Sequence, residues 1–495
     1  MKENDLMKDI VALCKRRGII YPSSEIYGGF ANTWDYGPYG VLLKNNVKKI
    51  WWEDMVQKRS DIVGLDSAIL MNPKVWEASG HLTEFTDPLV ECKKCHKRFK
   101  SDSLASNSNE DVEFSKKLNI PELAARYSVG KQCPECKASN WATESKQFNL
   151  MFETHIGSTE SKDNITYLRP ETAQGIFVNF KNVLDSTRVK LPFGIAQIGK
   201  AFRNEITPGN FTFRTLEFEQ FELEYFCYPK DADADFTKWR EARFNWYVGL
   251  GINKDKLRLT DHPKADLAHY AKAVSDVEYE FPFGWAELEG IANRGDYDLA
   301  QHQKVSGQNL EYADEDNNRI LPYVIEPSGG VDRATLAFLV DAYSEEQVNK
   351  TPLLPRACLP VGREGLGEEG VTPHLTSPYQ GEEKRSETRT VLRFHPKLAP
   401  IKAAILPLVK KDPELVNMAQ EIYAELKSSF FVEYDEDGTV GKRYRRQDEI
   451  GTPFCITIDS DSLTNKTVTI RHRDSMAQDR INAAEIKEFL QEKLQ

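Results

Sequence analysis

The chain has 495 residues, more than one hydrophobic core usually serves, so two or three domains are expected. Its composition, 40% hydrophobic and 28% charged, is that of a folded protein and excludes a largely disordered one. The net charge of -11 gives no indication of a nucleic-acid partner, although a local basic patch remains compatible with one.

The N-terminal segment predicts an amphipathic helix that ends at Gly18. Its expected buried face carries Leu6, Met7, Ile10, Val11 and Cys14. Acids and lysines interrupt the segment, which argues against a signal peptide. The sequence nowhere reaches the roughly 18 consecutive apolar residues that a transmembrane helix needs. We therefore expect a cytoplasmic protein.

Four of the eight cysteines form two Cys-x-x-Cys pairs. The paired residues are Cys92, Cys95, Cys133 and Cys136. Four thiolates on two tight turns can complete a tetrahedral zinc site with no open position for catalysis. Two unrelated surface pairs and a redox pair are the alternatives, but paired thiols in a cytosolic protein favour structural zinc. Residues 91–145 are therefore expected to form a zinc-binding insertion, with a loop between the pairs.

Residues 202–222 predict a β-hairpin whose long loop contains Pro208 and Gly209. The polar and aromatic residues expected on one face of its arms are Arg203, Glu205, Arg214, Phe218 and Glu222. A guanidinium binds phosphate through two hydrogen bonds and an aromatic ring stacks on a base, so this face suits a nucleoside triphosphate. Taken alone, alternating charge on a hairpin is more typical of a solvated surface.

A second arginine follows two glycines at the start of an apolar helix. Gly329 and Gly330 precede Arg333 in the segment GGVDRATLAFLVDAY. Glycines allow the backbone to approach a ligand closely, and the arginine can reach a terminal phosphate. This segment is therefore a second candidate contact for a nucleotide.

The C-terminal part of the chain reads as a separate unit. Residues 351–390 are rich in proline and glycine without an apolar period, so residues 346–392 are expected to be a linker or surface insertion. Alternating strand and helix patterns then predict a small mixed sheet covered by helices over residues 393–495. A basic cluster beside Tyr444 is either a solvated turn or a contact for RNA. The cluster consists of Lys442, Arg443, Arg445 and Arg446.

The pattern FRNE followed by R-x3-F-x3-E resembles motif 2 of the class II aminoacyl-tRNA synthetases, and GGVDRATLAFLVDAY resembles motif 3. Residues 42–70 resemble motif 1, the helix and strand through which this class dimerises. The segments RPETAQGIFVNF and VIEPSGGVDR are similar to the dimeric glycyl-tRNA synthetase family, and the resemblance covers nearly the whole chain. It implies an α+β fold: an antiparallel sheet flanked by helices over residues 1–345, and a mixed α/β anticodon-binding domain over residues 393–495.

The resemblance implies an enzyme that activates glycine with ATP and Mg²⁺ and transfers it to the 3′ end of tRNA(Gly), as a homodimer. Three other interpretations remain: a related synthetase for alanine or serine, a non-catalytic regulator that binds tRNA or an amino acid, and a zinc-containing nucleic-acid-binding module. Glu171, Glu222 and Glu326 can converge on one ammonium group, which favours glycine. Retention of Arg203 and Arg333 argues against a regulator, and the module would not explain the hairpin.

Residue roles follow from the same resemblance. Arg203 is expected on the α-phosphate, Glu205 on the adenine amino group and Phe218 against the ring. Glu287 is expected to hold Mg²⁺. The implied ATP-binding residues are Arg203, Asn204, Glu205, Phe213, Arg214, Phe218, Glu287, Leu288, Gly330 and Arg333, with Arg203, Glu205 and Arg333 catalytic. The implied glycine-binding residues are Glu171, Phe218, Glu222, Glu326, Ser328 and Gly330, and the implied tRNA contacts are Arg443, Arg445 and Arg446.

Overall fold

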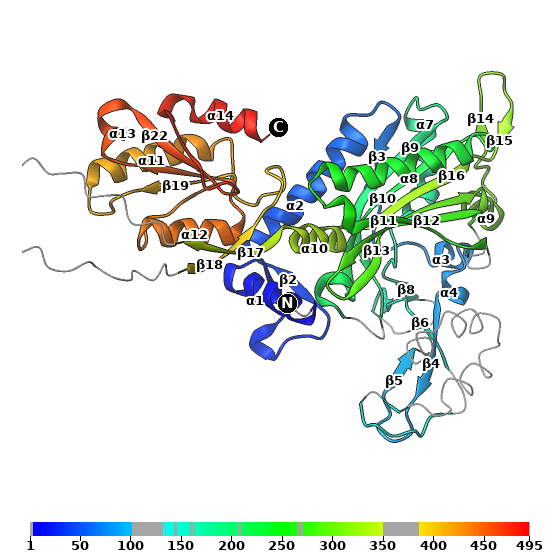
Figure 1. Cartoon of the computed structure of the whole chain (residues 1–495). Helices are drawn as coiled ribbons and strands as arrows, with labels where there is room; N and C mark the ends of the chain where they lie inside the picture. Colours follow the sequence, from blue (N-terminus) through cyan, green and yellow to red (C-terminus); the bar gives the residue numbers. More distant parts are fainter. Residues whose placement is uncertain are drawn as a thin grey trace, which may run out of the picture.

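The structure is a computed structural model in which two units follow one another along the chain (Figure 1). The larger is built on a seven-stranded sheet and the smaller, C-terminal one on a five-stranded sheet. The residues described are 3–100, 132–133, 135–142, 146–158, 161, 164–205, 209–264, 267, 271–349 and 386–494. Among them, no helix is both long and apolar enough to cross a membrane.

The large sheet has the strand order β11-β12-β13-β16-β10-β9-β3, and its pairings are antiparallel except between β3 and β9. Its strands are β3 (Ile62–Gly64), β9 (Phe193–Phe202), β10 (Glu217–Cys227), β11 (Leu257–Asp261), β12 (Ala273–Phe281), β13 (Gly284–Gly295) and β16 (Tyr323–Gly330). The expected antiparallel sheet and the β9-β10 hairpin are confirmed. Because β9 ends at Phe202, Arg203 and Glu205 lie in the loop and not within the strand.

Strand β10 separates the core from the functional face of the sheet. Its odd-numbered residues Phe221, Leu223 and Tyr225 pack into the main hydrophobic core. The even-numbered Glu222 lines a cavity, and Phe226 packs in a second core. Successive side chains of a strand point to opposite faces, so the alternation of these residues sets which of them reach the cavity.

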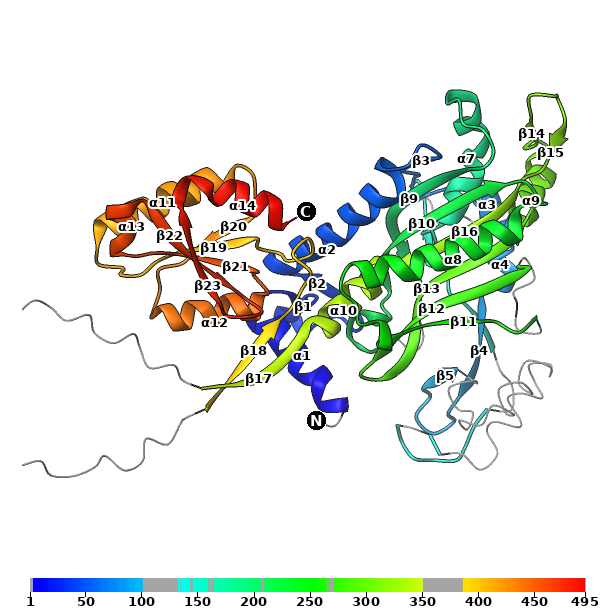
Figure 2. The same ribbon diagram turned by 45° about the horizontal axis from the view of Figure 1, so that its top comes forward.

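Helices cover both faces of the sheet (Figures 1 and 2). The main core is closed by α1 (Glu3–Arg17), α2 (Pro38–Trp52), α8 (Ala232–Gly249) and α10 (Val331–Ala342), and the second by α7 (Ala173–Ser186) and α9 (Tyr297–Ser306). Helix α1 has the expected amphipathic character: Ile10 and Cys14 are fully buried, and the helix is followed by Gly18 at a φ of +67°. That left-handed conformation favours glycine.

A smaller set of elements flanks the sheet. The three-stranded sheet that carries the first cysteine pair projects away from the main body in Figure 1. Its strands are β4 (Thr86–Glu91), β5 (Arg98–Lys100) and β6 (Lys146–Asn149). Two-stranded pairs form from β1 (Ile20–Pro22) with β2 (Trp34–Tyr36), β7 (Glu153–His155) with β8 (Ile165–Tyr167), and β14 (Tyr312–Ala313) with β15 (Arg319–Ile320). The short helices α3 (Lys74–Ala78) and α4 (His81–Glu84) precede β4.

The C-terminal unit has the strand order β20-β19-β21-β22-β23, with parallel and antiparallel pairs. Its strands are β19 (Ala403–Pro407), β20 (Val432–Tyr434), β21 (Phe454–Ile458), β22 (Thr467–His472) and β23 (Gln478–Asn482). Its helices are α11 (Pro413–Lys427), α12 (Val440–Ile450), α13 (Ser460–Asn465) and α14 (Ile486–Lys493). The expected mixed α/β unit is therefore present, but the basic cluster lies on helix α12 and not on a turn between strands.

The expected linker is structured at both ends. Strands β17 (Tyr343–Asn349) and β18 (Ser386–Leu392) pair antiparallel, so residues 346–349 and 386–392 are not irregular. Arg389 on β18 is fully buried and its Nε donates to Asp448 Oδ2 at 2.8 Å. This contact ties β18 to the C-terminal unit. The rest of the expected linker, residues 350–385, lies outside the described residues.

Candidate active site

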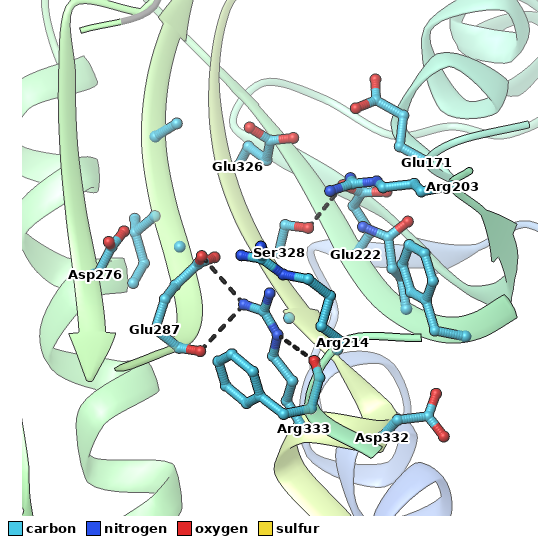
Figure 3. Close-up of a pocket in the computed structure, with 18 of the residues that line it drawn as sticks. Glu171, Arg203, Arg214, Glu222, Asp276, Glu287, Glu326, Ser328, Asp332 and Arg333 are labelled. Carbon is cyan, nitrogen blue, oxygen red and sulfur yellow. Dashed lines mark hydrogen bonds and ion pairs between the residues drawn. The ribbon is translucent and has the colours of Figure 1, made fainter. Parts of the chain in front are cut away.

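A cavity of about 330 Å³ opens on the sheet face that carries the even-numbered residues of β10 (Figure 3). Side chains from the β9-β10 hairpin, β12, β13, β16 and the start of α10 form its lining. Of the residues expected to bind ATP or glycine, those lining it are Glu171, Arg203, Glu205, Phe213, Arg214, Phe218, Glu222, Glu287, Glu326, Ser328, Gly330 and Arg333. The structure thus brings together segments that lie far apart in the sequence.

Arg203 stands at the end of β9, above the ring of Phe218. Its Nε donates to the carbonyl oxygen of Pro170 at 3.0 Å. Its guanidinium carbon lies 5.3 Å from the Phe218 ring centroid and 5.5 Å from that of Phe85. Cation–π contact and one backbone hydrogen bond hold the side chain across the cavity, where a guanidinium can bind phosphate.

Arg333 lies in the first turn of α10 and reaches across the sheet to β13. Its Nη1 is 3.1 Å from Glu287 Oε2, its Nε donates to the Phe213 carbonyl at 3.2 Å, and its guanidinium lies 4.4 Å from the Phe213 ring centroid. Burial disfavours the ionised form of Glu287, but Arg333 outweighs it, so the pKa of Glu287 is lowered. Figure 3 shows this ion pair at the end of the cavity opposite the glutamates.

The two glycines before Arg333 have different reasons to be glycine. A Cβ on Gly329 would lie 2.4 Å from the Phe221 ring, so packing of the core requires that position to be glycine. A Cβ on Gly330 would meet only its own helix neighbour Arg333, at ordinary contact distance. Both glycines line the cavity, so the expectation that their backbone approaches a ligand stays a prediction, and Gly329 has a packing reason in addition.

Two carboxylates face each other across β12 and β13. A Cβ on Gly290 would lie 3.6 Å from Asp276 Oδ1 and 3.7 Å from Glu287 Oε1, so both carboxylates border the space above this glycine. His262 Nε2 lies 2.8 Å from Asp276 Oδ2. Burial, followed by the charge of Glu287, raises the pKa of Asp276 to about 6. Two neighbouring carboxylates, one of which disfavours the charge of the other, suit a hard divalent cation.

The opposite end of the cavity is acidic and is organised by Arg294 on β13. Arg294 Nη1 donates to both oxygens of Glu326, at 3.0 and 2.9 Å. Its Nε and Nη2 donate to Asp298 at 2.7 and 2.8 Å. All three residues are at least nine-tenths buried. Such bidentate contacts hold the planar carboxylate of Glu326 in one orientation.

The other two glutamates have partners other than arginine. Glu222 accepts hydrogen bonds from Ser328 Oγ at 2.8 Å and from the Thr172 hydroxyl. Glu171 accepts from Gln174 Nε2 at 3.1 Å and lies 3.5 Å from His81 Nε2. These donors fix the carboxylates without fully neutralising them, which leaves negative charge for a cationic ligand.

The three glutamates differ in pKa because of burial and their neighbouring charges. Burial disfavours the charge of Glu171, but His81 and then Arg294 outweigh it, and its pKa is lowered. Burial and the charge of Glu171 raise the pKa of Glu222. Burial raises the pKa of Glu326, although Arg294 opposes the rise. Neighbouring acids with divergent pKa values are typical of functional sites.

Two expected ATP-binding residues do not line the cavity. The side chain of Leu288 is buried in the main core, on the other face of β13 from Glu287. Asn204 is held by its backbone, whose N–H donates to the Leu150 carbonyl at 2.8 Å. Sequence analysis in turn missed Arg294 and Asp276, which do line it. For Arg294 the sequence did contain a signal, because this residue and Asp298 lie four residues apart in the segment WAELEGIANRGDYDL.

The two Cys-x-x-Cys pairs converge into one cluster. Cys92 Sγ lies 3.5 Å from Cys136 Sγ, and Cys95 Sγ lies 3.6 Å from Cys133 Sγ, with all four sulfurs within 4.8 Å of one another. Both pairs adopt the same turn, closed by backbone hydrogen bonds and a positive φ at His96 and Lys137. A tetrahedron with Zn–S bonds of about 2.3 Å has edges of about 3.8 Å, so the sulfurs fit a zinc ion.

The structure corrects part of the expected basic cluster. Arg443 on α12 is 2% exposed, and its Nη1 and Nη2 donate to the carbonyls of Pro407 and Gly438 at 2.5 and 2.9 Å. Tyr444 packs against buried residues of the five-stranded sheet, and its hydroxyl forms a hydrogen bond with the Thr457 hydroxyl. The Arg443 side chain is therefore not available to an RNA, because helical geometry turns this position inward, whereas Tyr444 is only partly buried. The exposed members of the cluster include Lys442, together with the partly exposed Arg445 and Arg446.

An antiparallel sheet with arginines from a hairpin and from a following helix defines the catalytic core of a class II aminoacyl-tRNA synthetase. Residues 152–343 match the family described as tRNA synthetase class II core domain (G, H, P, S and T), and residues 402–493 match the anticodon binding domain. The chain belongs to the glycine–tRNA ligase family. It is 52% identical to the glycine–tRNA ligases of Geobacillus thermodenitrificans and Alkaliphilus oremlandii over 100% of both chains. It is 51% identical to that of Bacillus anthracis over 99% of both chains.

Proposed function

We propose that this chain activates glycine with ATP to glycyl-adenylate and transfers the glycyl group to the 3′ end of tRNA(Gly). The observation that carries the proposal is that one cavity combines cationic and anionic side chains. The arginines in its lining are Arg203, Arg214 and Arg333, and the glutamates include Glu171, Glu222 and Glu326. Bound side by side, the triphosphate and the ammonium of glycine would each meet opposite charge, and their reacting groups would meet between them.

The residues proposed to bind ATP have the following roles. Arg203 binds the α-phosphate and stabilises the charge that develops as the glycine carboxylate attacks. Glu205 accepts a hydrogen bond from the adenine amino group, and Phe218 stacks on the ring. Arg333, with Arg214, binds the γ-phosphate. The Arg333–Glu287 pair at 3.1 Å supports this, because a phosphate can replace the carboxylate as partner of the guanidinium.

Mg²⁺ accompanies ATP as part of the substrate. Glu287 and Asp276, whose carboxylates border the space above Gly290, are the groups that would hold it. Held there, the ion would neutralise phosphate charge, which would favour departure of pyrophosphate. The protein residues supply position and charge, and no covalent intermediate with the enzyme is required.

The acidic end selects glycine. Its ammonium binds among Glu171, Glu222 and Glu326, while Ser328 closes the pocket beside Glu222. Arg294 holds Glu326 in place. Glycine offers only an ammonium, a carboxylate and a bare Cα, so discrimination against larger amino acids rests on steric clash.

Further parts of the proposal concern structure and partners. The four-cysteine cluster holds a structural zinc ion, with no free coordination position. The C-terminal unit binds the anticodon arm of tRNA, with Arg445 and Arg446 at its surface. The chain acts in the cytoplasm as a homodimer. The exposed side chains of Ile26, Tyr27 and Phe30, 63–87% accessible, support a dimer because a second copy would cover them.

Glycine-dependent exchange of pyrophosphate into ATP tests the proposal without tRNA. Exchange is expected with glycine and not with alanine or serine, and Arg203→Ala should lower it by about 100-fold or more. The exposed Lys49 offers a matched control, since Lys49→Met should leave exchange unchanged. Folded protein that binds ATP but exchanges with no amino acid would favour a non-catalytic regulator. Equal exchange with alanine would overturn the steric account of the pocket.

A further inference from the structure

Glu224 is a buried acid that the proposed reaction does not use. It follows Glu222 by two residues on β10 and therefore points to the same face of the sheet. Its side chain is fully buried, and neither carboxylate oxygen has a hydrogen-bond partner among the described residues. A buried carboxylate without donors is costly, so this side chain requires an explanation.

The sheet register places Glu224 beside the glycine pocket. Glu222 pairs with Ser328 and Tyr225 with Ile325, so Glu224 stands directly across from Glu326 on β16. Carboxylate oxygens of Glu222, Glu224 and Glu326 lie within 4.8 Å of one another. Like charges directly opposite on neighbouring strands are destabilising, and at this burial they cannot all be ionised.

The hydrogen bonds decide which acid carries the proton. Glu326 receives two bonds from Arg294, and Glu222 receives bonds from Ser328 and Thr172, so both anions are stabilised. Glu224 receives none. Burial, followed by the charge of Glu326, raises its pKa well above the usual value, while Arg294 opposes the rise and Glu222 and Asp298 add to it. The shared proton therefore resides on Glu224.

We propose that Glu224 is a positioning residue of the glycine pocket: as a neutral carboxylic acid it donates a hydrogen bond to Glu326 and directs that carboxylate toward the substrate ammonium. Each oxygen of Glu326 has a lone pair left after its bond from Arg294, so the carboxylate can accept this donor. Glu326 would then be held by Arg294 on one side and by Glu224 on the other. This inference rests on the proposed function, since it assigns glycine to the cavity.

A neutral Glu224 also adjusts the charge of the pocket to its ligand. If Glu222, Glu224 and Glu326 were all ionised, their oxygens would form a set suited to a divalent cation. One proton on Glu224 leaves a site with less negative charge, better matched to a single ammonium. Selection of glycine over Mg²⁺, which must be present with ATP, would depend on that proton.

Two substitutions test whether Glu224 acts as a neutral hydrogen-bond donor, as an anion, or only as a side chain that fills space. Glu224→Gln keeps size and hydrogen bonding but cannot ionise, so the KM for glycine should stay within about twofold of the parent value. Glu224→Met keeps volume but loses the donor, so the KM for glycine should rise about tenfold, with kcat and the KM for ATP little changed. Glu280→Gln, on an exposed position of β12, is the matched control.

Three outcomes would overturn the inference. A tenfold rise of the KM for glycine in Glu224→Gln would mean that Glu224 acts as an anion. An unchanged KM in Glu224→Met would mean that it only fills space. A third measurement is independent of activity: the infrared carbonyl band of a protonated carboxyl group at pH 8 should be present in the parent protein and lost in Glu224→Gln, and its persistence would place the proton elsewhere. If the parent protein shows this band but no glycine-dependent exchange, the proposed function fails while the protonation of Glu224 stands.

Discussion

Lys44 Nζ lies 2.7 Å from Asp332 Oδ1, so a buried ion pair joins helix α2 to the residue that precedes Arg333. The same ammonium lies 2.7 Å from Glu219 Oε2 on β10. Asp332 Oδ2 in turn accepts a hydrogen bond from the backbone N–H of Glu219 at 2.7 Å. One cation therefore fixes the start of α10 and the edge of β10, the two elements that present Arg333 and Phe218 to the cavity.

Replacement of Lys44 should destabilise the protein strongly. Lys44→Met leaves Asp332 and Glu219 buried without that cation, which costs about 3 kcal/mol. Urea unfolding followed by tryptophan fluorescence measures the change. Lys49→Met on the same helix, where the side chain is 73% exposed, should change stability by less than about 0.5 kcal/mol. Equal effects of the two substitutions would contradict this account.

Loss of Arg294 should weaken glycine binding more than ATP binding. Without its guanidinium, Glu326 gains a proton more readily and becomes a poorer partner for an ammonium. The KM for glycine in Arg294→Gln should rise by about tenfold or more. Arg294→Lys keeps the charge but loses the fork and should recover only part of the affinity. Arg258→Gln, at a half-exposed position of β11, serves as control. An equal rise of the KM for glycine in this variant would exclude a specific role of Arg294.

Glu224 should make stability depend on pH. Burial and the charge of Glu326 raise its pKa well above the ordinary value of 4.5, so the folded state binds this proton more tightly than the unfolded state. Its contribution to stability is fully present below about pH 4.5 and declines as pH rises toward the raised pKa of the folded state. Glu171, whose pKa is lowered, stays ionised in this interval. Between pH 5.5 and 8.5 the parent protein should lose about 2 kcal/mol more than Glu224→Gln in urea unfolding. Parallel pH profiles would exclude Glu224 as the cause.

The cysteine cluster should contain one zinc ion per chain. Metal analysis of protein purified without added zinc should find it, and Cys133→Ser should abolish it. Cys455→Ala, in the C-terminal unit, should retain the metal. A strong chelator should lower the melting temperature of the parent but not that of Cys133→Ser. Full zinc content in Cys133→Ser would exclude the four-sulfur site.

Arg443 and Lys442 should behave differently although they are neighbours. Arg443→Met leaves the carbonyls of Pro407 and Gly438 without a donor inside the C-terminal unit, which should cost about 2 kcal/mol of stability. Lys442 is exposed, and Lys442→Ala should instead raise the KM for tRNA at low salt without changing the melting temperature. If Arg443→Met raised the KM for tRNA without changing stability, Arg443 would after all be a tRNA contact.

Much of the site was predictable because its residues recur at short, regular spacings. The arms of the β9-β10 hairpin, the helix after Gly330 and the four cysteines were all anticipated, and the structure contains them. Helix α12 was missed because its basic residues suggested a solvated turn, whereas the apolar parts of Arg443 and Tyr444 pack inward. Thr439 caps that helix by accepting from the Lys442 N–H, a signal that the sequence did contain.

The sequence by itself determined the order of elements, the alternation that turns Glu222 and Glu224 to one face of β10, and the chemistry present at each end of the site. These follow from backbone geometry, which repeats every two residues in a strand. Only the tertiary structure decided that Glu224 stands across from Glu326, that Arg294 is bonded to Glu326 and Asp298, and that Arg443 is buried. Register and burial bring together residues that are distant in the chain, and the resulting desolvation and repulsion set which acid carries a proton.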